Sequence, residues 1–257
     1  MNLSKMSFNK IKQYINSLEP KEKFKYIEQL KKDNRKTVLK FASKLERDHE
    51  RLINERERLK NLWQIEEEIF NSGFNLVAGI DEAGRGPLAG PVVAAAVILP
   101  KHELILGIND SKKIPEGKRE KLHKVIYEKA VDIGIGIVEN TVIDEINILN
   151  ATKLAMKKAI NSLKIQPDFL LIDAVNLADI NIRQKNIVKG DSKSISIAAA
   201  SIIAKVTRDS IVKEYEKKYP DFGFESHKGY GTKQHYEAIA KFGITPFHRK
   251  SFLNISR

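Results

Sequence analysis

The sequence predicts an α/β or α+β domain, in which helices flank a mixed β-sheet, with a helical extension before it. Strand-like apolar runs begin only after residue 73, whereas residues 7–70 repeat their apolar side chains at helical spacing. The chain has 257 residues, which fits one catalytic-size domain with an appendage. We therefore expect a helical N-terminal extension over residues 1–72 and one larger domain over residues 73–257, which includes a basic, helical C-terminal segment.

The extension is expected to consist of several helices. Apolar side chains such as Ile11 and Ile15 recur at the spacing of one helix face. A longer polar helix begins near Arg35 and ends near Gly73, a residue type that closes helices. Its apolar stripe is too narrow for a two-stranded coiled coil. We therefore favour packing within the chain over a dedicated binding role.

Five short strands are expected in the larger domain. Apolar runs predict them at residues 74–80, 92–99, 131–138, 169–172 and 187–188. Helices are expected at residues 116–129, 150–163 and 194–218. Gly134 and Gly136 alternate with isoleucines in the third strand, so one face of that strand is flat and suits a closely packed helix or neighbour.

Composition excludes several classes of protein. Hydrophobic residues make up 42% and charged residues 30% of the chain, so it can bury a core and is not disordered. The absence of Cys excludes a disulfide-stapled module. No apolar run reaches the roughly 18 residues of a membrane-spanning helix, and the first ten residues lack the apolar segment of a secretory signal. We expect a soluble, cytoplasmic protein without a membrane partner, and a monomer by default.

The net charge of +12 points to the partners of the protein. An excess of this size attracts polyanions such as nucleic acids. Basic side chains are densest in residues 227–257, which contain six Lys or Arg against one Asp or Glu. Charge alone leaves two interpretations open, because a solvated basic surface also keeps a protein soluble.

Acidic residues follow the ends of three expected strands, at Asp81 and Glu82, at Asp173, and at Asp191. Strand ends are where sheet domains present functional groups. Any one of these carboxylates alone could be a turn former or a helix cap. Four that converge would repel one another unless a divalent cation compensates their charge, and oxygen-only ligands favour Mg²⁺ or Mn²⁺.

A glycine-rich segment, residues 83–91, follows the first acidic pair. Glycines let backbone N–H groups approach a ligand closely, and Arg85 adds a donor suited to phosphate. The segment is neither a Walker A loop nor a dinucleotide-binding fingerprint, because a strand rather than a helix follows it. Alone it is equally typical of a plain turn. Next to the acidic pair it favours a backbone clamp beside a metal site.

Residues 78–91 resemble the opening signature of the type 2 ribonucleases H, and of ribonuclease HII above all. Further segments resemble the blocks of that family in the same order, at residues 109–113, 172–173, 189–194, 197–209 and 227–232. The match runs from about Leu76 to Phe252, and residues 1 to about 70 lie outside it.

The resemblance implies an RNase H-like fold, with a mixed sheet of about five strands flanked by helices. It implies an endonuclease that cuts the RNA strand of RNA–DNA hybrids and nicks duplex DNA on the 5′ side of single ribonucleotides. The products would carry 5′-phosphate and 3′-hydroxyl ends. By the same resemblance, the catalytic and metal-binding residues would be Asp81, Glu82, Asp173 and Asp191, with Mg²⁺ or Mn²⁺ as the cofactor.

The resemblance also implies which residues bind the substrate. Gly84, Arg85 and Gly86 would contact the ribose 2′-hydroxyl and the adjacent phosphate, which is how RNA would be distinguished from DNA. Tyr230 would pack on the sugar that follows the ribonucleotide, so that a DNA residue on the 3′ side is preferred.

Other polar residues have structural explanations beside functional ones. Lys112 and Lys193 match positions in the family's motifs and are expected either to contact phosphates or to be ordinary surface residues. Asp209 lies inside an expected helix, which favours a structural ion pair or a helix-end contact over a fifth catalytic carboxylate, and Asp110 favours a turn. The histidines of residues 227–257 show no metal-ligand spacing and are expected to hydrogen-bond locally or to face phosphate.

Two alternatives stay open. Ribonuclease HIII is similar in fold, but that group carries a β-rich N-terminal domain and a Glu as its fourth carboxylate, whereas here the extension is helical and the fourth position is Asp191. A non-catalytic nucleic-acid-binding module could keep the fold and the basic surface. Such a module has no need of four carboxylates, because they repel phosphate, so we favour the enzyme.

Overall fold

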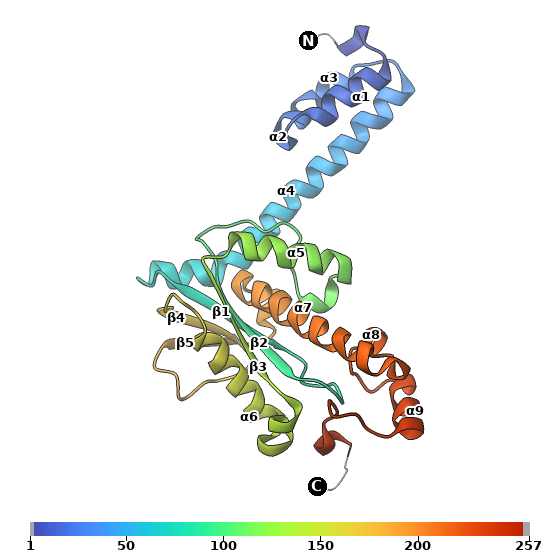
Figure 1. The fold of residues 1–257 in the computed structure, drawn as a ribbon. Coiled ribbons are helices and arrows are strands. Elements are labelled where there is room, and N and C mark those ends of the chain that lie inside the picture. Colours follow the sequence, from blue (N-terminus) through green and yellow to red (C-terminus); the bar gives the residue numbers. More distant parts are fainter. Residues whose placement is uncertain (1–2, 254–257) are drawn as a thin grey trace. The chain divides into compact units, whose positions relative to one another are not determined.

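The computed structural model describes residues 3–253. The chain divides into two compact units, Met1–Arg58 and Leu59–Arg257. Helix α4 (Lys36–Asn71) contributes residues to both of them (Figure 1). It is followed by Gly73, whose φ of +95° is the left-handed conformation in which glycine commonly terminates a helix.

The first unit is helical, as the sequence predicts. It contains α1 (Phe8–Ser17), α2 (Pro20–Lys23), α3 (Ile27–Lys31), the first part of α4, and the 3₁₀ turns Leu3–Lys5 and Phe24–Tyr26. Pro20 occupies the first turn of α2, where its missing N–H is not needed. The apolar faces of these helices enclose one small core, formed by Leu3, Ile11, Ile15, Ile27, Leu30, Val38, Ala42 and Leu45.

The second unit is built on a five-stranded mixed sheet, which confirms the predicted fold class. Its strands are β1 (Val77–Ala83), β2 (Val92–Ile98), β3 (Asp132–Val138), β4 (Phe169–Asp173) and β5 (Arg183–Ile187). They lie in the order β3-β2-β1-β4-β5. Strands β1, β2 and β3 pair antiparallel, whereas β4 runs parallel to both β1 and β5.

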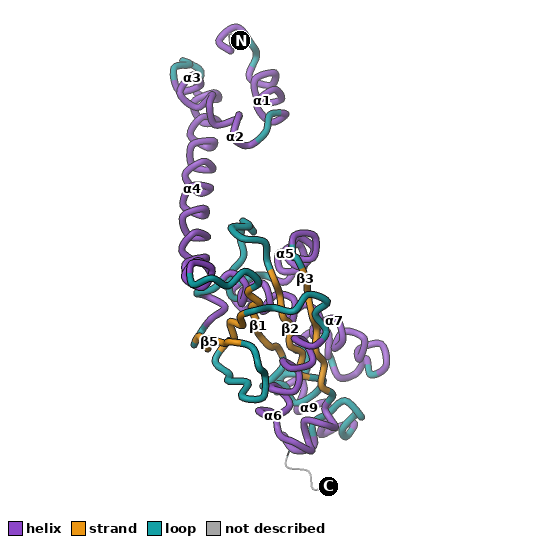
Figure 2. Tube along the Cα trace, turned by 90° about the vertical axis from the view of Figure 1, so that its left-hand side faces the viewer, coloured by secondary structure: helices purple, strands orange, loops and turns teal. Residues whose placement is uncertain are grey.

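Helices cover both faces of this sheet (Figures 1 and 2). On one face, α5 (Glu116–Lys129), α7 (Ile195–Lys218) and the last part of α4 pack on β2. On the other face, α6 (Asn140–Asn161) packs on β1, β2 and β4. The C-terminal segment adds α8 (Phe224–His227), α9 (Lys233–Phe242) and the 3₁₀ turns Pro220–Phe222 and Lys250–Phe252. A further pair of 3₁₀ turns lies at Ser111–Lys113 and Gly190–Ser192.

Two elements differ from the sequence prediction. Helix α6 begins ten residues earlier than expected and is kinked at Asn147, where φ is 66° and ψ is 165°. The Asn147 side chain accepts hydrogen bonds from the N–H groups of Leu149 and Asn150, so it restarts the helix as a cap would. Strand β5 is an edge strand with mostly polar, exposed residues, and the predicted strand at 187–188 overlaps only its last residue. Pairing with β4 forms this strand without the apolar pattern of a buried one.

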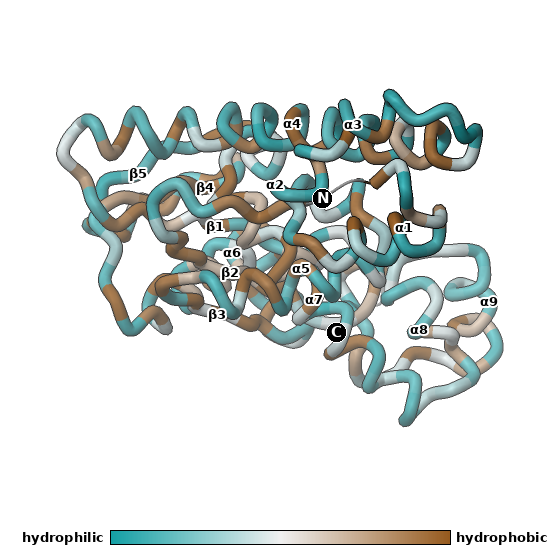
Figure 3. Tube along the Cα trace, turned by 90° about the horizontal axis from the view of Figure 1, so that it is seen from above, coloured by the Kyte–Doolittle hydropathy of each residue, from teal (hydrophilic) through white to brown (hydrophobic). Residues whose placement is uncertain are grey.

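Small residues bring the helices close to the sheet. A Cβ atom on Gly136 would lie 1.9 Å from the carbonyl oxygen of Ala155 in α6, and one on Gly79 would lie 2.1 Å from the carbonyl carbon of Ser196 in α7. The flat face expected for β3 is therefore the contact with α6. Hydrophobic residues concentrate in the central strands, while α4 alternates hydrophobic and hydrophilic residues along its length (Figure 3). Within residues 3–253, no helix combines the length and the apolar composition that crossing a bilayer requires.

Candidate active site

A cleft of about 350 Å³ lies at the carboxyl ends of β1 and β4. These two strands are parallel neighbours, with Ile80 paired to Ile172, so the residues that follow the pair share one edge of the sheet. The cleft is lined by Asp81, Glu82, Ala83, Gly84, Arg85, Gly86, Ser111, Lys112, Asp173, Ser201, Lys205 and Tyr230. Most of the residues that the sequence singles out, from four separate segments, therefore meet in one place.

The first acidic pair is largely withdrawn from solvent. Asp81 is only 5% exposed, and burial together with the charges of Glu82 and Asp173 raises its pKa well above the usual range. Burial also raises the pKa of Glu82, against the opposing effect of Arg85, whose Nη1 lies 3.3 Å from Glu82 Oε1. The second oxygen of Glu82, Oε2, is buried and has no hydrogen-bond partner in the described residues. The cleft therefore concentrates negative charge that protein donors only partly satisfy.

The other two carboxylates come from β4, the parallel neighbour of β1, and from the turn that follows β5. Asp173 ends β4, and its Oδ1 accepts a hydrogen bond of 2.8 Å from the N–H of Gly190. Asp191 follows Gly190 in a 3₁₀ turn and is buried, but it does not line the cleft. Burial, Asp110 and Asp173 all raise the pKa of Asp191. Asp191 is therefore joined electrostatically to the cluster through Asp173.

Asp110 has a role that the sequence did not reveal. Its Oδ1 accepts a hydrogen bond from the N–H of Lys112, which is the turn expected there. Its side chain also lies close enough to Asp191 to raise the pKa of that carboxyl. Nothing in the local sequence signals this contact, because the two residues belong to different loops.

A buried arginine holds the glycine-rich loop by hydrogen bonds to its carbonyl groups. Arg249 is fully buried and donates hydrogen bonds of 2.6 to 3.2 Å to the carbonyl oxygens of Gly84, Arg85, Gly90 and Pro91. Burial and the nearby Arg208 lower the pKa of Arg249 to about 9. Because C=O and the following N–H point in opposite directions across a trans peptide, these contacts turn the N–H groups of residues 85 and 86 away from Arg249. The loop can therefore offer backbone donors to a ligand.

Arg208 is a second buried guanidinium beneath the same loop. It donates hydrogen bonds to the carbonyl oxygens of Ala89, Pro91 and Lys228 at 3.0 to 3.1 Å. Burial lowers its pKa. Arg208 therefore joins the glycine-rich loop to the segment that carries Tyr230.

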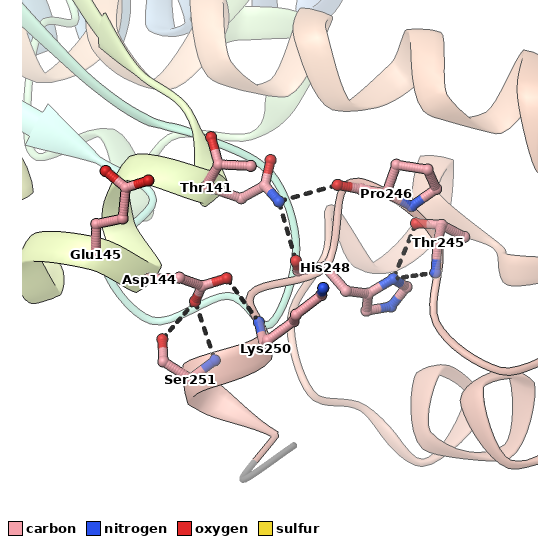
Figure 4. A pocket seen from close by; sticks show the side chains of 9 residues that line it. Thr141, Asp144, Glu145, Thr245, Pro246, His248, Lys250 and Ser251 are labelled. Atoms are coloured by element: carbon pink, nitrogen blue, oxygen red, sulfur yellow. Dashed lines mark hydrogen bonds between the residues drawn. The ribbon is translucent and has the colours of Figure 1, made fainter. Parts of the chain in front are cut away.

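Helix α6 hydrogen-bonds to the residues on both sides of Arg249. Figure 4 shows these contacts at His248, Lys250 and Ser251. A pocket of about 490 Å³ separates the start of α6 from the C-terminal segment. Across it, Asn140 donates hydrogen bonds to the carbonyl oxygens of Pro246 and His248. Asp144 accepts hydrogen bonds from the N–H groups of Lys250 and Ser251. This pocket shares no lining residue with the cleft, and its contacts hold the segment from which Arg249 projects.

Of the side chains expected to bind substrate outside the glycine-rich loop, two line the cleft and one does not. Tyr230 lines the cleft and is 42% exposed, with Lys205 Nζ 5.7 Å from the centroid of its ring. Lys112 also lines the cleft. The structure does not bring Lys193 into it, because Lys193 Nζ donates a hydrogen bond of 2.9 Å to the carbonyl oxygen of Val188.

Three cleft residues were missed by the sequence interpretation. Ser201 and Lys205 lie one turn apart on α7, and Ser111 comes from the loop before α5. Ser201 Oγ lies 2.9 Å from Ser111 Oγ, and a hydrogen bond with the Ser201 hydroxyl lowers the pKa of Asp81. Their helical spacing on the face that carries Arg208 is the signal that could have found the two residues of α7.

Asp209 forms the structural ion pairs that the sequence predicts. Its carboxylate lies 2.7 Å from Lys205 Nζ and 3.6 Å from Arg119 Nη2. It does not line the cleft. Asp209 therefore orients Lys205 beside Tyr230.

The three histidines of the C-terminal segment hydrogen-bond locally. His235 Nδ1 donates to the carbonyl oxygen of Tyr230, and His235 Nε2 lies 2.9 Å from His248 Nε2. The N–H of Thr245 donates to His248 Nδ1. His227 accepts a hydrogen bond from the N–H of Gly229. Within residues 3–253, no set of three or more acidic or histidine side chains is already gathered in the way that would hold a metal ion.

Comparison with known proteins identifies the family. A model of the family Ribonuclease HII matches residues 78–255, and a model of the Ribonuclease HII N-terminal domain matches residues 7–70. The chain belongs to the ribonuclease HII family. The N-terminal match also corrects the sequence interpretation, which left the first 70 residues outside the resemblance. Ribonuclease HII is a ribonuclease H, a nuclease that acts on nucleic acid.

Two similar ribonucleases HII cover almost the whole chain. The Ribonuclease HII of Clostridioides difficile (strain 630) is 58% identical, over 96% of this chain and 97% of its own. That of Acetivibrio thermocellus is 54% identical, over 97% of this chain and 98% of its own. The sequence similarity therefore includes the helical extension.

Solved structures share the fold of this ribonuclease HII. The ribonuclease H2 of Pyrococcus horikoshii OT3 aligns with a TM-score of 0.61 at 29% identity, covering 70% of this chain and 95% of its own. A ribonuclease HII of Archaeoglobus fulgidus, solved as a complex with PCNA, aligns with a TM-score of 0.59 at 30% identity, covering 68% and 94%. A Bst ribonuclease HIII in complex with Mn²⁺ has a TM-score of 0.53 at 20% identity, covering 70% and 68%, which shows a common fold alone.

Proposed function

We propose that this ribonuclease HII cuts the RNA strand of RNA–DNA hybrids and nicks duplex DNA on the 5′ side of single ribonucleotides. The products would carry 5′-phosphate and 3′-hydroxyl ends. The observation that carries the proposal is the meeting of Asp81, Glu82 and Asp173 with the loop of Gly84–Gly86 in one cleft. Carboxylates and outward-facing backbone donors side by side suit a reaction at a phosphodiester bond.

The cleft fits a divalent cation. Asp81, Glu82, Asp173 and Asp191 would supply oxygen ligands of the kind that Mg²⁺ and Mn²⁺ prefer. The buried Oε2 of Glu82, which has no partner in the described residues, is an acceptor that a cation would satisfy. Burial and the charges of Glu82 and Asp173 raise the pKa of Asp81, and a bound cation would oppose that effect. A cation bound at these residues supplies positive charge to the reacting phosphate and water. Asp191 would act beside Asp173, and Asp110 would orient the side chain of Asp191.

The glycine-rich loop would recognise the ribose. Gly84, Arg85 and Gly86 lie beside the carboxylates, and the N–H groups of residues 85 and 86 are turned away from Arg249. Such donors can bind a 2′-hydroxyl oxygen and the neighbouring phosphate, which distinguishes RNA from DNA. Tyr230 would pack on the sugar of the next nucleotide, and Lys112 would contact a phosphate. Lys193 would have to release the carbonyl oxygen of Val188 before it could do the same.

The first experiment is cleavage of a labelled DNA duplex that contains one ribonucleotide, beside an all-DNA duplex and an uninterrupted RNA–DNA hybrid, with Mg²⁺, Mn²⁺ or EDTA. We expect metal-dependent nicking at the 5′ side of the ribonucleotide and none in the all-DNA duplex. Cleavage of the hybrid alone would contradict recognition of single ribonucleotides and would favour an activity like that of ribonuclease HIII.

A substitution tests the carboxylates. Asp81→Asn removes a ligand charge with almost no change in shape, so we expect turnover to be abolished while thermal unfolding stays close to that of the wild type. Asp221→Asn, at an exposed position outside the cleft, is the matched control and should cleave normally. Normal metal-dependent cleavage by Asp81→Asn would show that the site is assigned wrongly.

A further inference from the structure

The first unit carries a groove of about 400 Å³ between α1 and α4. Phe8 and Phe41 line it and meet edge to face, with ring centroids 6.0 Å apart. Both rings are only partly buried, and they pack against the core that contains Leu45. The groove therefore exposes aromatic edges within a unit that is mostly covered by charged side chains.

Three exposed lysines border this groove. Lys12 comes from α1, and Lys40 and Lys44 lie one turn apart on the same face of α4. No hydrogen bond or ion pair with another residue of the described range, 3–253, neutralises any of the three. The carboxylate among the lining residues, Asp48, lies 3.9 Å from Arg51 instead. The groove thus gathers three ammonium groups against one carboxylate, and that carboxylate pairs with an arginine rather than with the three lysines.

The net positive charge of the first unit indicates that its ligand is a polyanion. Residues 1–58 contain sixteen Lys or Arg against nine Asp or Glu. Like charges around one groove repel one another, and a bound polyanion relieves that repulsion. A nucleic-acid backbone alternates phosphates, which ammonium groups bind, with sugars, whose C–H surface suits an apolar lining.

We propose that the groove formed by Phe8, Lys12, Lys40, Phe41 and Lys44 binds the sugar–phosphate backbone of duplex nucleic acid, as a site separate from the catalytic cleft. The inference adds a second contact to the proposed function and rests on it only for the choice of a duplex as the ligand. Contacts of this kind carry no sequence information. The groove therefore contributes affinity and leaves the choice of scissile bond to the cleft.

The salt dependence of binding tests this proposal. The probe is an all-DNA duplex of about three helical turns, or about 30 base pairs, which has no ribonucleotide to be cut. The full chain with Lys12→Gln, Lys40→Gln and Lys44→Gln is compared with a matched control, Lys21→Gln, Lys25→Gln and Lys32→Gln. The control lysines are exposed residues of the same unit that lie outside the groove, so both proteins lose the same charge.

We expect the slope of log K against log salt concentration to fall in magnitude by about 2 to 3 for the groove variant, because each phosphate contact contributes about 0.9. The control should keep the wild-type slope. A third protein with Lys→Arg at the three groove positions should also keep it, since arginine retains the charge. Equal slopes for the groove variant and the control would overturn the proposal.

Two further readouts separate the possible failures. Cleavage of a short duplex with one ribonucleotide reports on the cleft alone, so its absence in the wild type would contradict the proposed function without affecting the slopes. A polyglutamate peptide tests the other class of polyanion. If the groove variant lost binding to this peptide while keeping the duplex slope, the groove would belong to an acidic protein segment, and the proposal would be wrong.

Discussion

Glu66 of α4 accepts hydrogen bonds from both the backbone N–H and the hydroxyl of Ser196, at 3.0 and 2.6 Å. Ser194 donates to the same oxygen of Glu66 and also caps α7 by accepting from the N–H of Ile197. Glu66 is almost fully buried, and burial raises its pKa. The last part of α4 therefore closes the N-terminus of α7, where that helix begins its contact with β1.

Removal of this cap should destabilise the second unit. Glu66→Ala leaves the three donors of Ser194 and Ser196 without an acceptor, and we expect a loss of about 2 to 4 kcal/mol in the free energy of unfolding. Glu66→Gln keeps one acceptor oxygen and removes a charge that burial disfavours, so we expect a change within about 1 kcal/mol. Urea unfolding measures both. Equal losses for the two variants would show that the carboxylate charge, not the acceptor, matters.

Loss of the guanidinium beneath the glycine-rich loop should affect stability and cleavage together. Arg249→Met leaves the carbonyl oxygens of Gly84, Arg85, Gly90 and Pro91 without this donor, which should cost about 3 kcal/mol or more. Cleavage of the single-ribonucleotide duplex, measured where the variant is still folded, should also fall because the loop loses its support.

The neighbouring Lys250→Gln provides the control for that experiment. The side chain of Lys250 is exposed, and its backbone N–H, which a substitution keeps, bonds to Asp144. We expect its thermal unfolding and cleavage to match the wild type. An Arg249→Met protein that unfolds at the wild-type temperature would contradict the role given to the guanidinium.

The buried histidines should make stability depend on pH. Burial lowers the pKa of His235 and of His248 to about 4, below the 6.5 of an unfolded chain. The unfolded state therefore binds more protons between pH 6.5 and 4, so these groups cause stability to be lost as pH falls through that window. Each proton contributes about 1.4 kcal/mol per pH unit.

His248→Gln removes one of the two buried groups whose protonation makes stability depend on pH. Urea unfolding at several pH values should show a smaller loss of stability per pH unit for this variant than for the wild type, by about 1 kcal/mol. His102→Gln, which changes an exposed histidine, should leave the slope unchanged. The tautomers give an independent check, because His235 must carry its proton on Nδ1 to donate to Tyr230. Nitrogen-15 spectra that placed the proton on Nε2 would contradict this arrangement.

Tyr230 should determine the preference for an RNA–DNA junction. Tyr230→Ala removes a ring that lines the cleft, and we expect a loss of about 1 to 3 kcal/mol in discrimination between a single ribonucleotide and an uninterrupted hybrid. Binding to all-DNA duplex should change much less. Tyr127→Ala, an exposed tyrosine of α5 outside the cleft, is the control. Equal losses on both ribonucleotide substrates would exclude a role in packing on the following sugar.

Local sequence predicted the parts of the cleft that lie next to a strand. Asp81, Glu82 and Asp173 follow apolar runs, and strand ends at one edge of a sheet must meet. The two buried arginines that hold the glycine-rich loop were not predictable in this way. Arg208 and Arg249 reach carbonyl groups of the glycine-rich loop that lie 117 to 165 residues away, and the sequence near an arginine does not reveal such partners. Strand β5 was displaced for a related reason, because pairing with β4 rather than its own polar residues makes it a strand.

The contact of Arg249 with the glycine-rich loop also bears on the order in which the protein is made. Ribosomes add about 5 to 20 residues per second, and 158 to 165 residues separate Arg249 from Pro91 and Gly84. The carbonyl groups of the loop therefore wait about 8 to 30 seconds for their donor after they are synthesised. During that interval water must satisfy them. The acidic pair exists early in the nascent chain, but the loop beside it takes its final form only when translation has passed Arg249.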